Sequence, residues 1–270
     1  MSEYAGRSVI VTGAGRGLGR GLAEAFASRG AKVMLGARTL APALEAVGTI
    51  RAASGTAEAV QCDVSNRAAC RELVDAAAKT FGGVDVLIHC AADIPHGGVG
   101  AVSDEALESG LASIAKAAWW LLDAARPWLA AAPSGGRFIA IGSVNGTFTT
   151  VPNMTAYGMA KAALDAFVRG AAGDVVRENI TVNAINPGLV ATDNALRVLG
   201  AEGLATYGAT VPVGRAGTPA DIAHACFYFA SQHAGYCTGA SLKLDGGSSV
   251  AARGEGGEKI LQDRLKVQHN

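Results

Sequence analysis

The sequence predicts an α/β fold in which one parallel sheet carries helices on both faces. Three observations indicate it. Short β-branched segments alternate with longer amphipathic ones, a glycine-rich turn follows the first such segment, and no repeat or linker divides residues 1–250. Segments alternating in this way build βαβ units whose parallel strands are buried on both sides. We therefore expect one domain over residues 1–250, followed by a charged C-terminal tail over residues 251–270, which is either disordered or a short helix docked on a neighbouring subunit.

The first expected unit is a strand over residues 8–12, a glycine-rich turn and an amphipathic helix. Backbone N–H groups at such a turn point outward, and the dipole of the following helix favours anions. The glycines are spaced Thr-Gly-x-x-x-Gly-x-Gly, which is not the G-x-G-x-x-G fingerprint. A tight loop without a ligand is the alternative. We expect the turn to hold a pyrophosphate through Gly13, Gly15, Arg16, Gly17, Leu18 and Gly19.

The remaining strands are expected at residues 31–36, 57–62, 84–89, 136–141, 180–185 and 241–244. The helices are expected at residues 40–53, 67–80, 104–131, 155–176 and 219–231, with a loop from the end of the sixth strand to Arg215. Ligands of such sheets bind outside the carboxyl ends of the strands, where the strand order reverses. The residues that follow strands, and should therefore meet at this edge, are Gly13, Asp63, Ser143 and Gly188.

Tyr157 and Lys161 are spaced as neighbours on one face of a helix. A phenol has a pKa near 10 and is a poor proton donor at neutral pH. A nearby ammonium favours the phenolate, so we expect Lys161 to lower the pKa of Tyr157 toward the working pH of a general acid or base. Ser143 follows a buried strand, and its hydroxyl could hold a carbonyl oxygen beside the tyrosine. Since Tyr-x-x-x-Lys occurs by chance in many helices, an exposed, functionless pair is the alternative.

Composition excludes several classes of function. The chain has 270 residues, half of them hydrophobic, and a formal net charge of zero, so no attraction to nucleic acid or to anionic membranes is expected. The apolar stretch at residues 117–132 contains charges and a proline and is not expected to span a bilayer. Five cysteines without a Cys-x-x-Cys pair, and histidines without metal-ligand spacing, predict neither disulfides nor a metal site. With no signal peptide visible, a cytoplasmic protein is expected.

In this order the motifs resemble those of the short-chain dehydrogenase/reductase family, in its compact single-domain branch, which includes 3-oxoacyl carrier-protein reductase-like members. The resemblance covers residues 6–250. The matching motifs are the turn Thr12 to Gly19, Asp63 after the third strand, Ser143 with Tyr157 and Lys161, Asn186-Pro187-Gly188 with Thr192, and Thr238-Gly239 with Asp245-Gly246-Gly247.

The resemblance implies a Rossmann-type sheet of seven strands and a homotetramer or homodimer built partly from the helix that carries Tyr157. It also implies hydride transfer between a nicotinamide cofactor and a carbonyl or alcohol substrate. Ser143, Tyr157 and Lys161 would be the catalytic residues. Besides the glycine turn, the cofactor-binding residues would be Arg38, Asp63, Val64, Cys90, Ala91, Tyr157, Lys161, Pro187, Gly188, Val190 and Thr192.

This chain departs from the family pattern at two places. His89-Cys90-Ala91-Ala92 stands where the family usually has Asn-Asn-Ala-Gly. Ile114, with Ser113 beside it, stands where a catalytic asparagine usually helps to hold a relay water between the lysine and solvent. The second departure motivates an alternative function, a regulatory or sensing protein that binds NADP(H) but turns over little substrate.

The end of the second strand predicts NADP(H) as the cofactor. NAD-binding proteins usually place an Asp or Glu there to accept a hydrogen bond from the ribose 2′-hydroxyl. This chain has Ala37-Arg38, and no acidic residue follows before Glu45. Arg38 and Arg16 could bind a 2′-phosphate through charge-assisted hydrogen bonds. The alternative is that Arg38 faces solvent and Arg16 only caps the turn.

The segment from residue 189 to residue 214 is expected to contact the substrate. Its large side chains are mostly apolar, with Arg197 the one basic residue among them. This composition predicts a pocket for a neutral carbonyl compound, although a phosphopantetheine-linked acyl group remains an alternative, and the same residues could instead be core or interface. The residues concerned are Leu196, Val198, Leu199, Leu204 and Tyr207, together with Ile94, Phe148 and Met154.

Overall fold

The computed structural model describes residues 3–250, and these form one sheet of seven parallel strands in the order β3-β2-β1-β4-β5-β6-β7. The order reverses between β1 and β4, as in a doubly wound fold. The expected α/β class with a seven-stranded parallel sheet is therefore confirmed. The strands are β1 (Ser8–Thr12), β2 (Lys32–Ala37), β3 (Thr56–Gln61), β4 (Val86–His89), β5 (Gly136–Ile141), β6 (Ile180–Pro187) and β7 (Ser241–Leu244).

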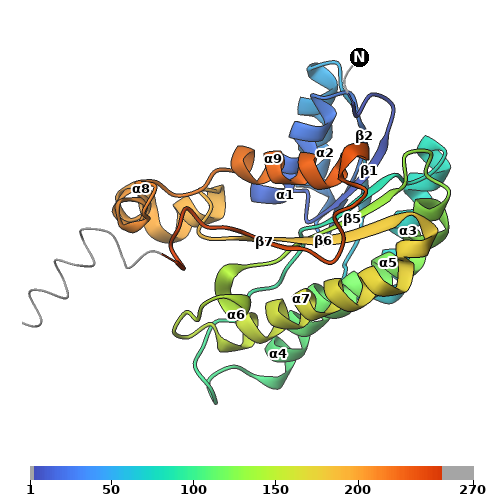
Figure 1. Ribbon diagram of the computed structural model, residues 1–270. Coiled ribbons are helices and arrows are strands. Elements are labelled where there is room, and N and C mark those ends of the chain that lie inside the picture. The colour runs from blue at the N-terminus through green and yellow to red at the C-terminus, as the bar shows by residue number, and fades with distance from the viewer. Residues whose placement is uncertain (1–2, 251–270) are drawn as a thin grey trace, which may run out of the picture.

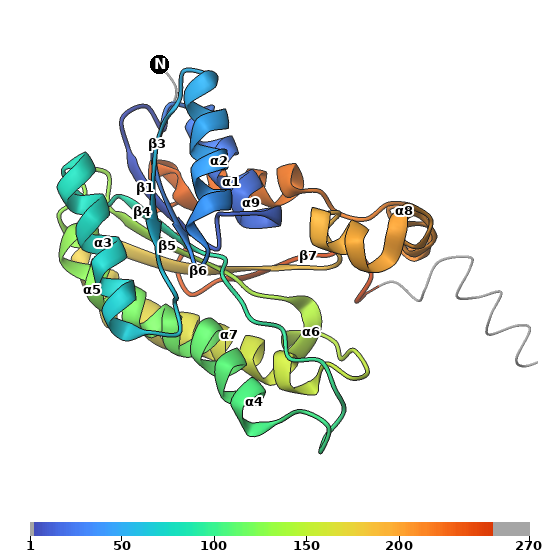
Figure 2. The same cartoon turned by 180° about the vertical axis from the view of Figure 1, so that it is seen from behind.

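Helices cover both faces of the sheet (Figure 1), and Figure 2 shows the same two layers from behind. One layer contains α1 (Gly17–Ala27), α2 (Leu40–Ala52) and α9 (Pro219–Ala230), and the other contains α3 (Arg67–Phe81), α4 (Asp104–Leu111), α5 (Ala117–Ala130) and α7 (Thr155–Val175). Each face has its own apolar core. Strand side chains alternate between the cores, so that Val9 and Val11 pack on the α1 side and Ile10 on the α3 side.

The expected single helix over residues 104–131 is wrong in one respect, because a π-helical turn, Ala112–Lys116, separates α4 from α5. Two side-chain contacts accompany this turn. His89 contacts the carbonyl oxygen of Ile114 through Nε2 at 3.0 Å, and the hydroxyl of Ser113 accepts the backbone N–H of Asp93 at 2.9 Å. The contacts come from the last residue of β4 and from the segment that follows it, so periodicity within the helix could not have predicted the turn.

The expected loop between β6 and Arg215 is also wrong, since it contains the helix α8 (Asp193–Thr210). Thr192 caps this helix by accepting the N–H of Ala195, and Asp193 lies in the first turn. Gly200, with φ of +69°, interrupts the helix, and glycine adopts this backbone conformation without steric cost. In Figures 1 and 2 α8 projects from the sheet and its covering helices.

Three short segments complete the secondary structure of the described part of the chain: α6 (Val144–Thr147) and the 3₁₀ turns Val176–Glu178 and Gln232–Ala234. No helix among residues 3–250 combines the length and apolar character needed to cross a bilayer. The expected charged tail over residues 251–270 lies outside the described residues.

Candidate active site

The glycine turn after β1 contacts the segment after β4 through its backbone. Gly13 has φ of +68°, and a Cβ at this position would come within 2.8 Å of the Cα of Ala91. A Cβ on Gly19 would come within 2.3 Å of the carbonyl oxygen of Gly13, so the start of α1 also needs glycine. Gly15 lies against Ala37 at the end of β2, and Gly17 lies against Thr192. The fold therefore brings three distant segments, at Ala37, Ala91 and Thr192, around this turn.

A buried hydrogen-bond chain joins the ends of β1 and β4. The Thr12 hydroxyl accepts the N–H groups of Cys90 and Ala91 at 3.1 and 3.2 Å, so its own proton goes to Nδ1 of His89 at 2.9 Å. This assigns the proton of the neutral imidazole to Nε2, which donates to the carbonyl of Ile114. Burial lowers the pKa of His89 to about 4, in keeping with a neutral ring. The hydrogen bond from His89 to the carbonyl of Ile114 thus joins the two positions at which this chain departs from the family pattern.

Ser143, Tyr157 and Lys161 come together at the carboxyl end of β5. Lys161 is buried, and its Nζ donates to the carbonyl oxygen of Ile141 at 2.7 Å. The same Nζ lies 5.6 Å from the centre of the Tyr157 ring, and the Ser143 side chain is near enough to the Tyr157 hydroxyl to lower its pKa. The three residues selected from the sequence therefore form one cluster.

The expectation that Lys161 lowers the pKa of Tyr157 is wrong for this structure. Burial raises the pKa of Tyr157 to about 12, and the hydrogen bond with Ser143 only partly opposes the rise. Burial also lowers the pKa of Lys161, to about 8. The ammonium is directed at the Ile141 carbonyl, so desolvation has the largest effect on the pKa of the phenol. Tyr157 is therefore protonated at neutral pH, and its raised pKa makes it a weaker acid than a free phenol.

A buried polar network holds the backbone of Ser143 in place. The side-chain oxygen of Asn186, in β6, accepts the backbone N–H of Ser143 at 2.9 Å, and its amide nitrogen donates to the Ser241 hydroxyl at 2.8 Å and to Asp165 at 3.4 Å. Ser241 donates to the same Asp165 carboxylate, which also pairs with Arg169. Asn186 belongs to a motif visible in the sequence, but its contact with Ser143 could not be predicted, because residues separated by 43 positions carry no local signal of contact.

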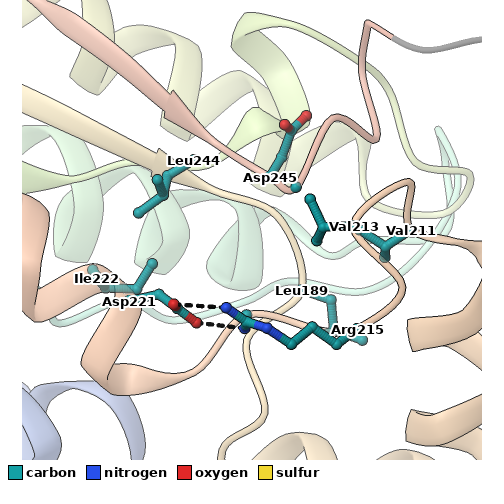
Figure 3. Close-up of a pocket in the computed structure, with 10 residues that line it drawn as sticks. Leu189, Val211, Val213, Arg215, Asp221, Ile222, Leu244 and Asp245 are labelled. Carbon is teal, nitrogen blue, oxygen red and sulfur yellow. Dashed lines mark hydrogen bonds and ion pairs between the residues drawn. The ribbon is translucent and has the colours of Figure 1, made fainter.

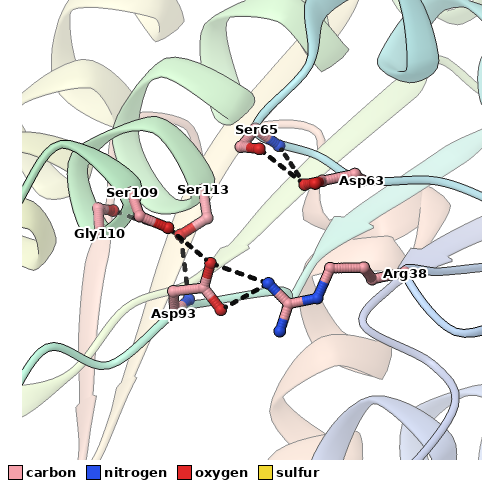
Figure 4. A network of polar contacts seen from close by, with 7 residues as sticks. All are labelled: Arg38, Asp63, Ser65, Asp93, Ser109, Gly110 and Ser113. Atoms are coloured by element: carbon pink, nitrogen blue, oxygen red, sulfur yellow. Dashed lines mark hydrogen bonds and ion pairs between the residues drawn. The ribbon is translucent and has the colours of Figure 1, made fainter. Parts of the chain in front are cut away.

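The residues expected near the adenosine end lie at the carboxyl ends of β2 and β3 (Figure 4). Asp63 accepts both the N–H and the hydroxyl of Ser65, bonds that hold its pKa below the usual range. Arg38 forms an ion pair with Asp93, a residue that sequence analysis did not select. Val64 is buried, whereas Arg16 is exposed at the start of α1. Arg38 therefore follows β2 and has a carboxylate partner, whereas Arg16 is exposed at the N-terminus of α1.

The remaining residues selected for cofactor binding follow β4 and β6. Cys90 and Ala91 are half-buried beside Gly13, and burial raises the pKa of the Cys90 thiol to about 11. Gly188 lies against Asp245, where a Cβ would come within 3.1 Å of the Asp245 Cβ. The segment that begins at buried Pro187 continues through Val190, which pairs with Gly217, to Thr192 beside Gly17. It therefore runs from the sheet to the glycine turn.

A separate cavity of about 180 Å³ lies between the end of α8, the start of α9 and the end of β7 (Figure 3). Its walls are mainly apolar, and the Arg215–Asp221 ion pair lies at one side. Leu189 connects it to the segment after β6, but Ser143, Tyr157 and Lys161 do not line it. We therefore do not place the reaction there. Within residues 3–250 no group of three or more His, Cys, Asp or Glu side chains could hold a metal ion.

Comparisons with known proteins agree with this architecture. A family model described as enoyl-(acyl carrier protein) reductase matches residues 13–249. The 2,5-dichloro-2,5-cyclohexadiene-1,4-diol dehydrogenase of Sphingobium indicum is 35% identical, over 92% of this chain and 98% of that protein.

Two solved structures are similar throughout. A candidate NAD(P)-dependent gluconate 5-dehydrogenase from Beutenbergia cavernae, with NADP bound at low occupancy, is 32% identical over 92% of this chain and 98% of its own, with a TM-score of 0.83. A 7α-hydroxysteroid dehydrogenase complexed with NADH and 7-oxo glycochenodeoxycholic acid is 29% identical over 90% and 94%, with a TM-score of 0.84. With the same sheet and a match along most of its length, the chain belongs to the short-chain dehydrogenase/reductase family of oxidoreductases.

Proposed function

We propose that the protein transfers a hydride between NADP(H) and a carbonyl or alcohol substrate, with Tyr157 as the general acid and base. The observation that carries this proposal is the cluster of Ser143, Tyr157 and Lys161 at the strand ends that also surround the glycine turn. A proton donor, a hydroxyl that can orient an oxygen, and a cation are thereby available beside a candidate phosphate site.

The chain's residues would supply positioning and the proton. The hydroxyls of Ser143 and Tyr157, which lie near each other, would hold the substrate oxygen between them. Tyr157, whose phenol is protonated at neutral pH, would donate its proton to the oxygen during reduction. We therefore expect carbonyl reduction to be faster than alcohol oxidation near pH 7. The nicotinamide, when bound, supplies or accepts the hydride.

The glycine turn fits a dinucleotide, because Gly13, Gly15 and Gly17 leave its backbone without side chains at the start of α1. Asp63 and Val64 would contact the adenine, Cys90 and Ala91 the ribose, and Lys161 the other ribose. The segment that grips the nicotinamide would consist of Pro187, Gly188, Val190 and Thr192.

The proposed preference for NADP(H) rests on this chain's own residues. One structural relative contains NADP and another NADH, so membership of the family does not decide the cofactor. Strand β2 itself ends without a carboxylate that could accept from a ribose 2′-hydroxyl, and Arg38, directly after it, is exposed, as is Arg16 at the start of α1. Each charged hydrogen bond to a phosphate contributes roughly 1.5–3 kcal/mol, enough for a tenfold preference or more.

The proposed substrate is a neutral carbonyl compound. The helix α8 exposes Leu196, Val198, Leu199 and Tyr207, and Phe148 is exposed on the segment after Ser143. These apolar side chains would cover a substrate of low polarity. An acyl group on phosphopantetheine is the alternative substrate, and an assay with and without the carrier portion distinguishes the two.

The direct test is a panel of carbonyl compounds and alcohols assayed with NADPH and NADH by cofactor absorbance. We expect turnover with NADPH, and a shift toward NADH in the double variant Ala37→Asp with Arg38→Ala. Equal use of NADH by the unchanged protein, or an unchanged preference after removal of both Arg38 and Arg16, would contradict the cofactor assignment.

One observation favours a second candidate function, an NADP(H)-binding sensor with little turnover. Ile114 lacks the amide of the usual asparagine, and its carbonyl oxygen is already engaged by His89. Cofactor binding without turnover across the substrate panel would support this second function.

We also propose that the protein assembles as a homodimer or homotetramer through α5 and α7. Trp119 and Met159 are exposed on these helices, and the Trp119 ring lies 6.2 Å from that of Phe167. Sedimentation velocity tests this, because Trp119→Glu should dissociate such an assembly.

A further inference from the structure

The Arg38–Asp93 ion pair joins the end of β2 to the segment after β4. One guanidinium nitrogen, Nη1, donates to both carboxylate oxygens of Asp93, at 3.0 and 3.1 Å (Figure 4). The two residues are 55 positions apart in sequence. The pair therefore occupies the same guanidinium that the proposed function assigns to the 2′-phosphate.

Asp93 is the better anchored partner of this pair. Its carboxylate also accepts the hydroxyl of Ser109 at 2.9 Å, and its backbone N–H donates to the hydroxyl of Ser113 at 2.9 Å. The Asp93 side chain is 28% exposed, whereas that of Arg38 is 62% exposed. Rearrangement of the pair thus requires Arg38 to move and leaves the carboxylate in place.

A second negative charge lies close to Arg38. Asp63 is held by Ser65, and the charge of Arg38 contributes to keeping the pKa of this carboxyl low. A phosphate that approaches Arg38 therefore enters a region with two fixed carboxylates, whereas a ribose hydroxyl carries no charge and is not repelled in this way.

We propose that Asp93 is a specificity-determining residue, which competes with the 2′-phosphate of the cofactor for Arg38 and so limits the preference for NADP(H) over NAD(H). The proposal rests on the proposed function, since it assumes a nicotinamide cofactor in this site. Asp93 needs no contact with the reacting atoms, and its effect should appear in cofactor binding.

The test is the variant Asp93→Asn, with dissociation constants for NADPH and NADH measured by fluorescence titration. The asparagine oxygen can still accept the Ser109 hydroxyl, so the change removes chiefly the charge. Because exposed ion pairs are weak, we expect the dissociation constant for NADPH to fall by about two- to fivefold, and that for NADH to change by less than about 1.5-fold.

Asp123→Asn is the matched control, because Asp123, which lies on α5, also pairs with an exposed arginine, Arg67 of α3, at 2.9 Å. It should change neither constant. In an Arg38→Ala background Asp93→Asn should change the ratio of the two constants less than it does when Arg38 is present. If Asp93→Asn does not fold, Asp93→Ser removes the same charge and keeps the backbone bond to Ser113.

Three results would overturn the inference. Equal tightening of NADPH and NADH would mean that the ion pair merely obstructs the adenosine end. No change in either constant would mean that Asp93 does not compete for Arg38. Binding of neither cofactor by the unchanged protein would instead remove the proposed function, and the inference with it.

Discussion

Replacement of Asn186 by alanine should reduce both stability and turnover, through the backbone of Ser143. Asn186 is fully buried and accepts the N–H of Ser143. Its removal leaves that N–H without an acceptor and takes two amide donors from the Ser241 and Asp165 side chains. An unpaired buried group costs about 1–3 kcal/mol, so with the lost donors the free energy of unfolding should fall by about 2–4 kcal/mol.

The kinetic effect of the same variant follows from the position of the Ser143 hydroxyl. A displacement of about 1 Å at a positioned group lowers the rate by about 100-fold, so we expect kcat to fall by about 10- to 100-fold. KM should change little if Ser143 acts mainly in the transition state. Denaturant titration gives the stability, and initial rates on folded protein give kcat and KM.

Ser241→Ala provides the control within the same network. It removes the hydroxyl that donates to Asp165 at 2.5 Å but leaves the Asn186 bond to Ser143 in place. We expect a stability loss of about 1–3 kcal/mol with kcat within about threefold of the unchanged protein. If Asn186→Ala loses stability but keeps its kcat, Ser143 is positioned by other contacts and the reasoning is refuted.

Three further predictions concern single positions. Tyr157→Phe should bind cofactor normally but lose at least ~100-fold in kcat, and near-normal turnover would contradict its role as acid and base. Because burial lowers the pKa of Lys161 to about 8, the unfolded chain binds the extra proton above that pH. The stability of the unchanged protein relative to Lys161→Met should therefore rise from pH 8 to 10, which denaturant titrations at several pH values check, and a flat difference would disprove it. Ile114→Asn places an amide in the apolar core and should either lower the free energy of unfolding by about 2–4 kcal/mol or raise the rate at low pH. If the variant shows neither of these effects, the Ile114 side chain is misplaced.

Local patterns predicted the sheet because each strand carries its signal within a few residues. Segments such as Ser8–Thr12 are β-branched and buried throughout, and a glycine turn ends the first of them. Helix α7 was predicted for the same reason, and with it the i, i+4 spacing that places Tyr157 and Lys161 on one face. The position of the candidate site at the strand ends then followed from the rule that parallel strands direct their carboxyl ends to one edge of the sheet.

Helix α8 and the π turn were not predicted, for different reasons. The apolar residues of α8 do not cover a core, so periodicity was weak, and Gly200 divides the segment. The π turn at Ile114 is accompanied by contacts from His89 and Asp93, which lie 25 and 20 positions from their partners. Neither feature is encoded in a short window of sequence.

The sequence by itself determined which chemical groups are available: a phenol, an ammonium, a hydroxyl and a side-chain-free turn, each at the end of a predictable strand or on a predictable helix. The tertiary structure alone decided their states. Burial raises the pKa of Tyr157 and lowers that of Lys161, whereas the spacing had predicted that Lys161 lowers the pKa of Tyr157. The fold also gives Arg38 a carboxylate partner and Ser143 a buried amide. Desolvation and ion pairing depend on the distances between atoms from different segments, and those distances exist only once the sheet has assembled.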